Sequence, residues 1–435
     1  MDNKRWGATY IVRKLNENGH QALFAGGAVR DLILGREPND YDIATSAHPE
    51  QVQKIFKNTK AVGKSFGVIL VQLNGDEFEV ATFRNDGDYT DGRRPDSVSF
   101  TRSAWEDAER RDFTINALFY CPLTNQILDF VNGMRDIEKG TVRFVGDSLD
   151  RIEEDKLRML RLIRFALKLD FKMGATSFSA VQCHASDILN VSSERIREEL
   201  VKMLELNRPK RMFKLLHKSG LLHYILPEIE ALINDEQDPT WHPEGNTFKH
   251  TLMTLENLNG ENTLLKLAGL FHDVGKPATH EVREGRITNR LHASVGKEMT
   301  EEIMRRLKFS NDEIETVTAL VHNHMKAHVA KNMRKSRVKR LLQNEWAPDL
   351  IKLCRADQNA SHKNTGSADY LQGLLDNLEP EELKPEPLIN GHDLINMGFK
   401  PGPIFKKILD TVMDAQLEGT ISTREEALSI VRNME

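Results

Sequence analysis

The chain is poor in cysteine and has no long hydrophobic run. Its three cysteines, Cys121, Cys183 and Cys354, stand far apart with no CxxC pair, so neither a disulfide framework nor a zinc site built from cysteines is expected. No apolar run approaches the ~20 residues of a membrane span. The charged N-terminus "MDNKRWGATYIVRKLNENG" is unlike a secretory signal. These absences predict a cytoplasmic protein with no membrane segment.

Excess positive charge is also missing, since the net charge is −5. Composition alone therefore does not indicate a nucleic-acid-binding protein, although a local basic face would suffice for phosphate contacts. "NTKAVGKSFG" has Gly63 followed by Lys64 and Ser65, but Asn58 stands where a P-loop requires its first glycine. A P-loop nucleotide site is therefore excluded.

What is present is a change of pattern along 435 residues, a length that suggests several domains. Short strands and helices alternate near the N-terminus, and helical periodicity dominates from about residue 150 onward. We predict an α/β head with a small mixed sheet, followed by a largely α-helical body. The expected parts are residues 1–140 (α/β head), 141–235 (helical neck), 236–375 (helical domain) and 376–435 (C-terminal helical tail).

Two motifs in the head suggest a nucleotide site. "LFAGGAVRDLILG" places Gly26 and Gly27 between a predicted strand and a helix, where backbone amides can hold phosphate oxygens, and Arg30 adds a charge. "NDYDIAT" places Asp40 and Asp42 two apart in a predicted strand, so that both carboxylates share one face. Such a pair could hold Mg²⁺. Taken alone, the same residues also suit a tight turn with solvated acids.

Two further stretches add charged groups to this picture. Glu79, on a neighbouring predicted strand, is a candidate third carboxylate, although simple alternation would also explain it. "ERRDFTINALFY" concentrates Arg110, Arg111 and Asp112 at an expected helix start, with Asn116 one turn later. A charged first turn is common on helices, so these residues acquire meaning only from their neighbours.

The segment "EEDKLRMLRLIRFALKL", residues 153–169, is expected to form one amphipathic helix. Asp155, Arg158, Arg161 and Arg164 recur every three residues and form a polar stripe. An ordinary solvated helix face would show the same pattern. However, cytosine and adenine both present an amine beside a ring-nitrogen acceptor, so a fixed carboxylate and guanidinium could read either base. Asp155 and Arg158 make a plausible protein template for CTP and ATP.

These motifs together resemble the class II tRNA nucleotidyltransferases, the CCA-adding enzymes and their poly(A) polymerase relatives. The resemblance extends over roughly residues 20–230 and includes "GGAVRDLILGREPNDYDIAT", "RRDFTINA", "NGMRDIEKG", "EEDKLRMLRLIRFALKL" and "SSERIREEL". It implies a template-independent enzyme that adds CCA to the 3′ end of tRNA from CTP and ATP. Residues 1–140 would then be the nucleotidyltransferase catalytic head, and residues 141–235 the nucleotide-selecting neck and RNA-binding region.

The same resemblance implies roles for individual residues. Mg²⁺ is expected on Asp40 and Asp42, which would be the catalytic residues. The nucleotide is expected to contact Gly26, Gly27, Arg30, Arg111, Asp112, Asp155, Arg158, Arg161 and Arg164.

Two alternatives within the family remain. Poly(A) polymerase relatives typically have two adjacent basic residues where "VGKSFG" has Ser65 in second place, which favours tRNA as the substrate. The stretch "RNDGDYTDGRRPDSVSF" resembles the family's flexible loop, which CC-only enzymes are understood to lack. Neither feature separates a full CCA-adding enzyme from one that adds only the terminal adenosine.

Histidines and aspartates gather later in the chain. "LFHDVGKPATH" resembles the HD phosphohydrolase superfamily, and its match implies a metal site on His250, His272, Asp273 and Asp357, with His292 and His324 as extra candidates. Imidazole and carboxylate together suit a transition metal such as Ni, Mn or Co. A chain that is mainly an HD phosphohydrolase, with a head that only binds RNA, is the alternative from a different functional class.

Overall fold

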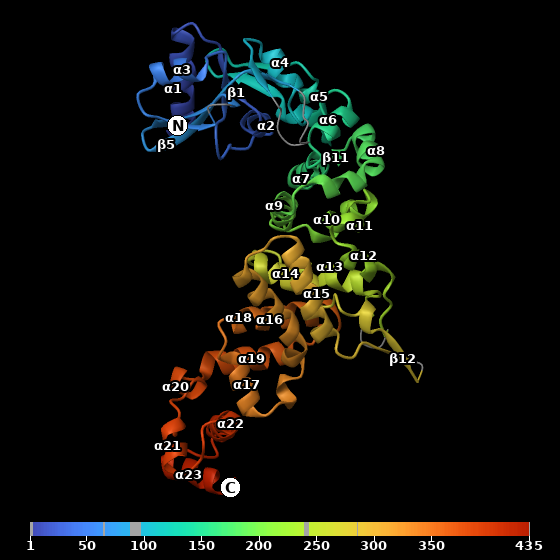
Figure 1. Cartoon of the computed structure of the whole chain (residues 1–435). Helices are drawn as coiled ribbons and strands as arrows, with labels where there is room; N and C mark the ends of the chain where they lie inside the picture. The colour runs from blue at the N-terminus through green and yellow to red at the C-terminus, as the bar shows by residue number, and fades with distance from the viewer. Residues whose placement is uncertain (1–2, 64–65, 88–96, 239–242, 285, 435) are drawn as a thin grey trace. The chain divides into compact units, whose positions relative to one another are not determined.

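The computed structural model describes residues 3–63, 66–87, 97–238, 243–284 and 286–434. Ser65 and residues 88–96 of the predicted flexible loop lie outside them. Among the described residues, no helix is both long and apolar enough to cross a lipid bilayer. The chain divides into two compact units, Met1–Ile225 and Leu226–Glu435 (Figure 1). The four-part division predicted above is finer than this split and stays a prediction.

A seven-stranded mixed sheet forms the centre of the first unit. Its strands lie in the order β3-β4-β5-β2-β1-β8-β9, and all neighbours are antiparallel except β2 and β5. Their bounds are β1 Ala22–Ala25, β2 Ile43–Thr45, β3 Thr59–Gly63, β4 Val68–Leu73, β5 Asp76–Thr82, β8 Leu118–Cys121 and β9 Gln126–Asp129. The predicted α/β head with a small mixed sheet is confirmed.

The middle of this sheet follows from short apolar runs. Every residue of β1 is buried, as expected for a central strand whose two faces are both covered. Asn74 and Gly75 have positive φ values of 54° and 90° and join β4 to β5 with Leu73 opposite Asp76. This geometry is the hairpin turn that an Asn-Gly pair favours. Helix α1 (Asn3–Glu17) packs against β1.

Short elements beside the sheet carry many of the charged residues of the head. They are α2 Gly27–Ile33, α3 Pro49–Ile55, β6 Arg84–Asp86, β7 Val98–Phe100, α4 Ala104–Glu109, the 3-10 helix Thr114–Asn116, α5 Gly133–Glu138 and β10 Thr141–Val142. The helices that follow are α6 Ser148–Glu154, α7 Arg158–Leu169, α8 Ala175–Cys183, α9 Ser193–Leu204, α10 Pro209–Lys218 and α11 Leu221–Ile225, with strand β11 Lys172–Met173.

Two local predictions were wrong in detail. Residues 153–169 do not form one helix, because α6 ends at Glu154 and α7 begins at Arg158. Asp155 causes the break: its Oδ1 accepts a hydrogen bond from the Leu157 N–H at 3.1 Å, a local turn in which Asp competes with helix continuation. Asp40 and Asp42 precede strand β2 instead of lying within it, although the Asp42 carbonyl still accepts from the Ala25 N–H at 2.9 Å.

The second unit is almost entirely helical, as predicted for the body. Its central helices are α13 Thr247–Asn257, α14 Thr263–Phe271, α15 His292–Arg306, α16 Asn311–His328 and α18 Ala347–Ala360. Helix α16 begins with a capping box: the Ser310 hydroxyl accepts a hydrogen bond from the Glu313 N–H, and the Glu313 carboxylate accepts one from the Ser310 N–H. A two-stranded ribbon, β12 Glu281–Arg283 and β13 Arg286–Thr288, precedes α15.

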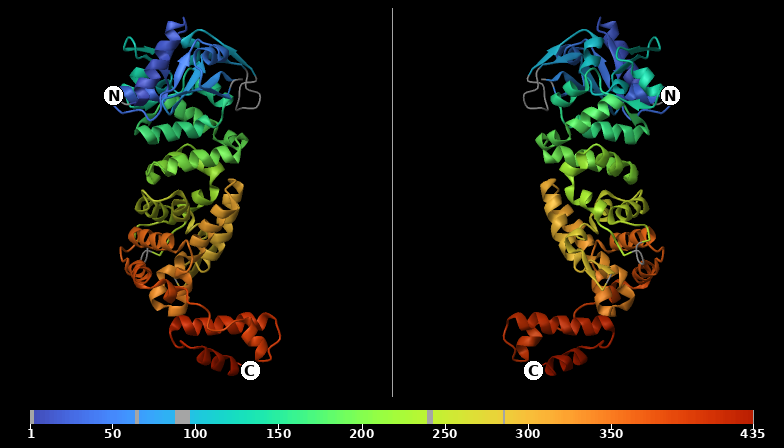
Figure 2. Two further views of the ribbon diagram at one scale, coloured as in Figure 1. Left: turned by 90° about the vertical axis from the view of Figure 1, so that its left-hand side faces the viewer. Right: turned by 90° about the vertical axis from the view of Figure 1, so that its right-hand side faces the viewer.

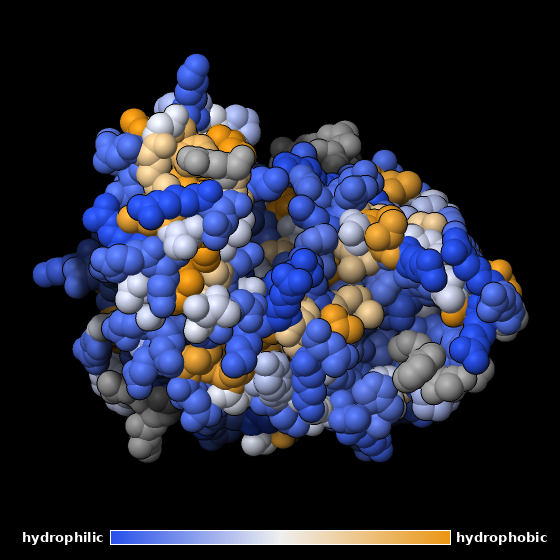
Figure 3. All heavy atoms as spheres, turned by 90° about the horizontal axis from the view of Figure 1, so that it is seen from below, coloured by the Kyte–Doolittle hydropathy of each residue, from blue (hydrophilic) through white to orange (hydrophobic). Residues whose placement is uncertain are grey.

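The C-terminal helices have a small core of their own. Leu394, Ile408, Val412, Ala427 and Val431 are among its buried residues. The other α-helices of the second unit are α12 Pro227–Ala231, α17 Lys335–Leu342, α19 Gly366–Asn377, α20 Pro380–Leu383, α21 Gly391–Asn396, α22 Pro403–Glu418 and α23 Arg424–Arg432. Figure 2 shows α22 and α23 in red, and the face drawn in Figure 3 is mostly hydrophilic with hydrophobic residues scattered over it.

Candidate active site and a buried histidine–aspartate centre

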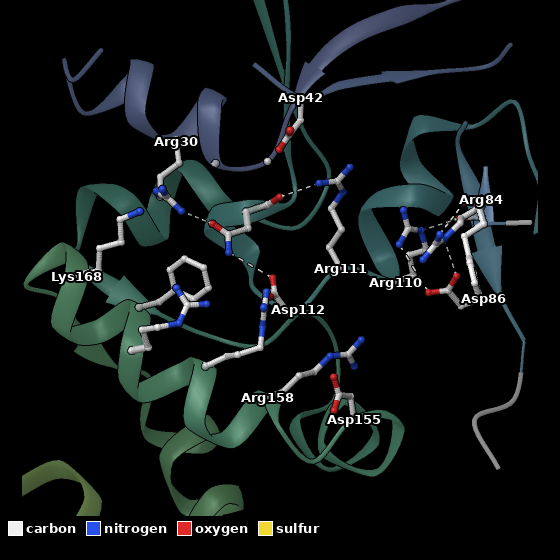
Figure 4. A pocket seen from close by; sticks show the side chains of 17 residues that line it. Arg30, Asp42, Arg84, Asp86, Arg110, Arg111, Asp112, Asp155, Arg158 and Lys168 are labelled. Carbon is white, nitrogen blue, oxygen red and sulfur yellow. Dashed lines mark hydrogen bonds and ion pairs between the residues drawn. The ribbon is translucent and has the colours of Figure 1, made fainter. Parts of the chain in front are cut away.

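A pocket of about 650 Å³ in the first unit gathers the residues predicted for the nucleotide site (Figure 4). This volume suits a small-molecule ligand. Ten of the eleven residues predicted for this site line it, namely Gly26, Gly27, Arg30, Asp42, Arg111, Asp112, Asp155, Arg158, Arg161 and Arg164. The fold therefore brings the glycine turn, one metal-binding candidate and the candidate base reader to one place.

The glycine turn is shaped for close approach. Gly26 has φ +68°, and a Cβ added there would lie 3.1 Å from the Arg111 Nη1 atom, so only glycine fits comfortably. Arg30 is buried on the adjoining helix, where its Nη1 donates to the Asn116 side-chain oxygen at 2.6 Å and its Nε donates to Asp31 at 2.9 Å. These contacts hold the Arg30 guanidinium in place at the pocket wall.

The two predicted metal-binding aspartates occupy different surroundings. Asp42 lines the pocket, and burial of its carboxylate, followed by the nearby Glu79 charge, raises its pKa to about 6 despite the opposing charge of Arg111. Asp40 does not line the pocket; its carboxylate is largely exposed and lies 3.4 Å from Lys4 Nζ. A cation beside Asp42 would reduce the repulsion between its carboxylate and Glu79. The exposed ion pair of Asp40 with Lys4 is weak, so Asp40 could leave Lys4 and bind the same cation.

Asp112 connects the head to helix α7. Its Oδ1 accepts from the Phe113 N–H at 2.8 Å and from the Asn116 amide at 3.3 Å, while its Oδ2 accepts from Arg161 Nε at 3.0 Å. Burial would raise the pKa of Asp112, but Arg161 outweighs this effect and holds the pKa below its usual value. A continuous set of hydrogen bonds therefore runs from Arg30 through Asn116 and Asp112 to Arg161 (Figure 4).

Neighbouring groups fix the positions of Asp155 and Arg158, the candidate base reader. Asp155 Oδ2 accepts from Arg195 Nη2 at 2.8 Å. Arg158 Nη1 donates to the Arg151 carbonyl at 2.9 Å and pairs with Glu154. A carboxylate has about four acceptor sites and a guanidinium five donors, so both groups keep capacity for a base. Sequence reasoning did not find Arg195 or Glu154 as supports, although both lie in the quoted motifs.

An aromatic ring in the pocket was also missed. Phe165 lines the pocket between three guanidinium groups: its ring centroid is 4.5 Å from the Arg164 Cζ atom, 5.6 Å from that of Arg30 and 5.7 Å from that of Arg161. Arg164 also pairs with Glu199 at 2.5 Å. Since guanidinium groups stack favourably on rings, Phe165 helps to hold the arginines apart. An apolar residue within an arginine stripe was the available clue. The other unpredicted lining residues are Phe66, Arg84, Asp86, Arg110, Asn116 and Lys168.

The four predicted ligands of the second site come together in the helical unit. His250 Nε2 lies 3.0 Å from Asp357 Oδ1 and 3.3 Å from His272 Nε2, and His272 Nε2 lies 3.2 Å from Asp273 Oδ2. All four side chains are buried. They come from α13, from the residues that follow α14, and from α18.

A second group shares Asp273 with the first. His292 Nε2 is 3.4 Å and His324 Nε2 is 3.9 Å from Asp273 Oδ1, and the two histidine Nε2 atoms are 3.2 Å apart. His328 Nε2 adds a contact of 2.7 Å with Asp357 Oδ2. The extra candidates His292 and His324 therefore belong to the same cluster, and His328 joins them unpredicted.

Hydrogen bonds at the outer ring nitrogens show what the centre can hold. The Nδ1 atoms of His272, His292 and His324 lie 2.6–2.9 Å from the backbone carbonyls of Gly269, Asn289 and Val321, which can only accept. Each Nδ1 therefore carries a proton and donates to its carbonyl, so the Nε2 atoms that face the centre are the positions available to a metal ion. Burial lowers the pKa of His324 to about 3, so this ring stays neutral. Converging lone pairs and carboxylates fit a transition-metal ion.

Comparisons with known proteins point in one direction. Family models match for the poly A polymerase head domain at residues 22–143, the RNA- and SrmB-binding region of polymerase A at 170–233, and tRNA nucleotidyltransferase domain 2 at 289–431. The chain is 30% identical to the CCA-adding enzyme of Lactobacillus johnsonii, over 96% of this chain and 94% of that protein.

Two further similarities agree. The CCA-adding enzyme of Enterococcus faecalis is 45% identical over 45% of this chain and 48% of its own length. The crystal structure of the Bacillus stearothermophilus CCA-adding enzyme in complex with CTP matches with a TM-score of 0.75 and 28% identity, over 100% of this chain and 98% of that one.

Proposed function

Because this chain belongs to the CCA-adding enzyme family, we propose that it completes the 3′-CCA end of tRNA from CTP and ATP and releases pyrophosphate. The observation that carries this proposal is the pocket in which ten of the eleven residues predicted for the nucleotide site converge. One related structure, 28% identical, contains CTP, which agrees with a nucleotide in this pocket.

The phosphate end of the reaction falls to the glycine turn and its neighbours. The amides at Gly26 and Gly27, together with Arg30 and Arg111, are placed to bind and orient the triphosphate. Asp42, joined by Asp40 on release from Lys4, would hold Mg²⁺. When bound, Mg²⁺ neutralises phosphate charge and makes the attacking 3′-hydroxyl more acidic.

The choice of base falls to Asp155 and Arg158. Asp155 can accept a hydrogen bond from the exocyclic amine that cytosine and adenine share, and Arg158 can donate to the adjacent ring nitrogen. Uracil and guanine present a carbonyl and a ring N–H there, so both contacts would be mismatched. The contacts from Arg195 and Glu154 fix the two groups before a nucleotide arrives.

An incorporation assay tests this proposal. The protein is incubated with tRNAs ending before CCA, after C and after CC, with each labelled NTP separately. We expect C addition to the first two and A addition to the third. Extension of only the CC-ended tRNA would show an A-adding enzyme, and long A-tails on unrelated RNA would show a poly(A) polymerase. Full incorporation by Asp42→Ala would refute the metal assignment.

A second activity is supported by the histidine–aspartate centre. We propose that His250, His272, Asp273 and Asp357 hold a transition metal, and that the centre hydrolyses a phosphoester. The supporting observation is the convergence of histidine Nε2 atoms whose opposite nitrogens are already satisfied. The bound ion would supply an activated water, while Lys276 Nζ, 2.6 Å from Asp273 Oδ2, steadies that ligand.

Metal content and hydrolysis test this centre separately from the nucleotide site. We expect purified protein to bind Mn²⁺, Co²⁺ or Ni²⁺ by elemental analysis and to hydrolyse p-nitrophenyl phosphate or its diester. Both properties should disappear in His272→Ala and persist in Asp42→Ala. Unchanged metal content in His272→Ala would reject the site.

A further inference from the structure

Asp107, on α4, has a buried carboxylate that binds two arginine side chains at once. Its Oδ1 accepts from Arg110 Nη2 at 2.6 Å and Nε at 3.0 Å. Its Oδ2 accepts from Arg111 Nη2 at 2.9 Å and Nε at 3.1 Å. Oδ1 also accepts from the backbone N–H of Arg84 at 3.2 Å. The side chain is only 1% exposed and lies behind the pocket wall that both arginines help to form.

Arg111 is the partner that faces the reaction centre. Its Nη1 donates to the Asn116 carbonyl at 3.3 Å, and its guanidinium lies 5.0 Å from the centroid of the Phe119 ring. The same Nη1 approaches the backbone of Gly26, and its charge acts on Asp42. With Asp107 on its other edge, the Arg111 guanidinium has one orientation, directed at the glycine turn and the metal-binding carboxylate.

Arg110 extends the same carboxylate's influence to the strand before the loop. Its Nε donates to the Arg84 carbonyl at 3.1 Å, and its Nη1 lies 3.7 Å from Asp86 Oδ2. Arg84, Asp86 and Arg110 all line the pocket (Figure 4). Through its contacts with Arg110, Arg111 and the Arg84 backbone, Asp107 therefore connects helix α4 with strand β6 and with the residue next to Asp112.

We propose that Asp107 is a positioning residue for nucleotide addition, which acts by fixing Arg111 against the glycine turn where the phosphates of the incoming NTP bind. This inference rests on the proposed function and adds a residue that does not itself touch the nucleotide. Burial would raise the pKa of Asp107, but Arg111 and Arg110 outweigh this effect and lower it, so the carboxylate stays charged at neutral pH. Removing its charge would leave two arginines without their shared partner.

A double-mutant cycle tests the inference. Asp107→Asn keeps the shape but removes the charge, and we expect kcat/KM for both CTP and ATP to fall by about 10- to 100-fold. Discrimination against UTP and the KM for tRNA should stay within about twofold, because the base reader is untouched. In the Arg111→Ala background, Asp107→Asn should lower kcat/KM further by less than about threefold, because its effect passes through Arg111. Glu109→Gln, on the exposed side of the same helix, is the matched control.

Two outcomes would overturn the inference: an Asp107→Asn enzyme within twofold of wild type, or an equal loss in wild-type and Arg111→Ala backgrounds, which would indicate a structural role only. Thermal melts accompany every variant. If Asp107→Asn does not fold, Asp107→Ser, which also removes the charge, enters the same cycle with the same criteria. Failure of the wild-type protein to extend tRNA would instead reject the proposed function.

Discussion

The fold disfavours the charged form of the Asp42 carboxylate. Its folded pKa of about 6 lies above the ordinary 3.8, so the folded state binds the proton more tightly than the unfolded state. Between these pH values, stability must therefore fall as the pH rises, and above pH 6 the ionised Asp42 destabilises the fold. A residue proposed to bind metal is thus held at a cost to stability.

We predict that Asp42→Asn raises the free energy of unfolding at pH 7.5 by about 1 kcal/mol, allowing for solvent screening, while abolishing incorporation. Urea unfolding in metal-free buffer at pH 7.5 and pH 4 measures this, and the gain should shrink at the lower pH. A second readout is the pH profile of kcat/KM, whose acid limb should move to lower pH as Mg²⁺ increases, because metal competes with the proton. A loss of stability in Asp42→Asn would contradict the argument.

Gly26 provides a second prediction for a single residue. Gly26→Ala places a methyl group 3.1 Å from Arg111 Nη1 at a backbone with φ +68°. We expect an increase in KM for CTP and ATP of roughly tenfold or more, with a stability loss of about 1 kcal/mol. Gly35→Ala is the matched control, because Gly35 has the same φ but open space around its Cβ position. Equal KM values in the two variants would show that the contact with Arg111 is unimportant.

Individual elements differ in how firmly the sequence determines them. The Asn74-Gly75 turn was predictable because the turn geometry depends on those two residues alone. The break at Asp155 was not, because Asp155 could serve equally in a helical stripe or in a turn, and its contact with Arg195, 40 residues away, helps to decide between them. The positions of Asp40 and Asp42 before β2 likewise depend on pairing with β1, which local pattern does not contain.

The capping box of α16 permits a prediction for an element. Ser310→Ala removes the side-chain acceptor for the Glu313 N–H, and we expect a loss of about 1 kcal/mol in stability of the helical unit. Hydrogen exchange should show faster opening of α16, which carries His324 and His328, with α7 unchanged. Equal protection of α16 in both proteins would contradict the role of the cap. Thr316→Ala, within the exposed part of the same helix, is the control.

For the whole molecule, the predicted order of an α/β head and a helical body is confirmed. Ten of the eleven residues predicted for the nucleotide site line one pocket, because they lie in compact motifs that the fold brings together, while their roles stay predictions. The structure brings His250, His272, Asp273 and Asp357 together, and their role as metal ligands stays a prediction; His328 was not predicted, since only tertiary packing places it beside Asp357. Supporting residues such as Asp107 were not predicted either, because their contacts are seen only in the folded structure.

Two compact units with separate sites should respond separately to metals. We predict that Mn²⁺ raises the melting temperature of the second unit, because it binds the folded state, and that EDTA reverses this. Since the contacts with Asp357 and Glu244 overcome burial and raise the pKa of His250 to about 9, metal must displace a proton, and affinity should rise with pH up to about 9. Calorimetry with unit-resolved hydrogen exchange measures both effects. His272→Ala should abolish the shift, and a shift retained in that variant would contradict the assignment.

The break between α6 and α7 has a consequence for how this enzyme could change. Asp155 both interrupts the helix and lines the pocket where it is proposed to read the base, so its two tasks cannot be altered independently. A redesign for uridine would substitute a donor at this position, lose the turn contact to Leu157, and disturb the start of the helix that carries Arg161 and Arg164. A variant that selects a different base must therefore also find another way to start helix α7, which makes such a change in nucleotide choice more difficult.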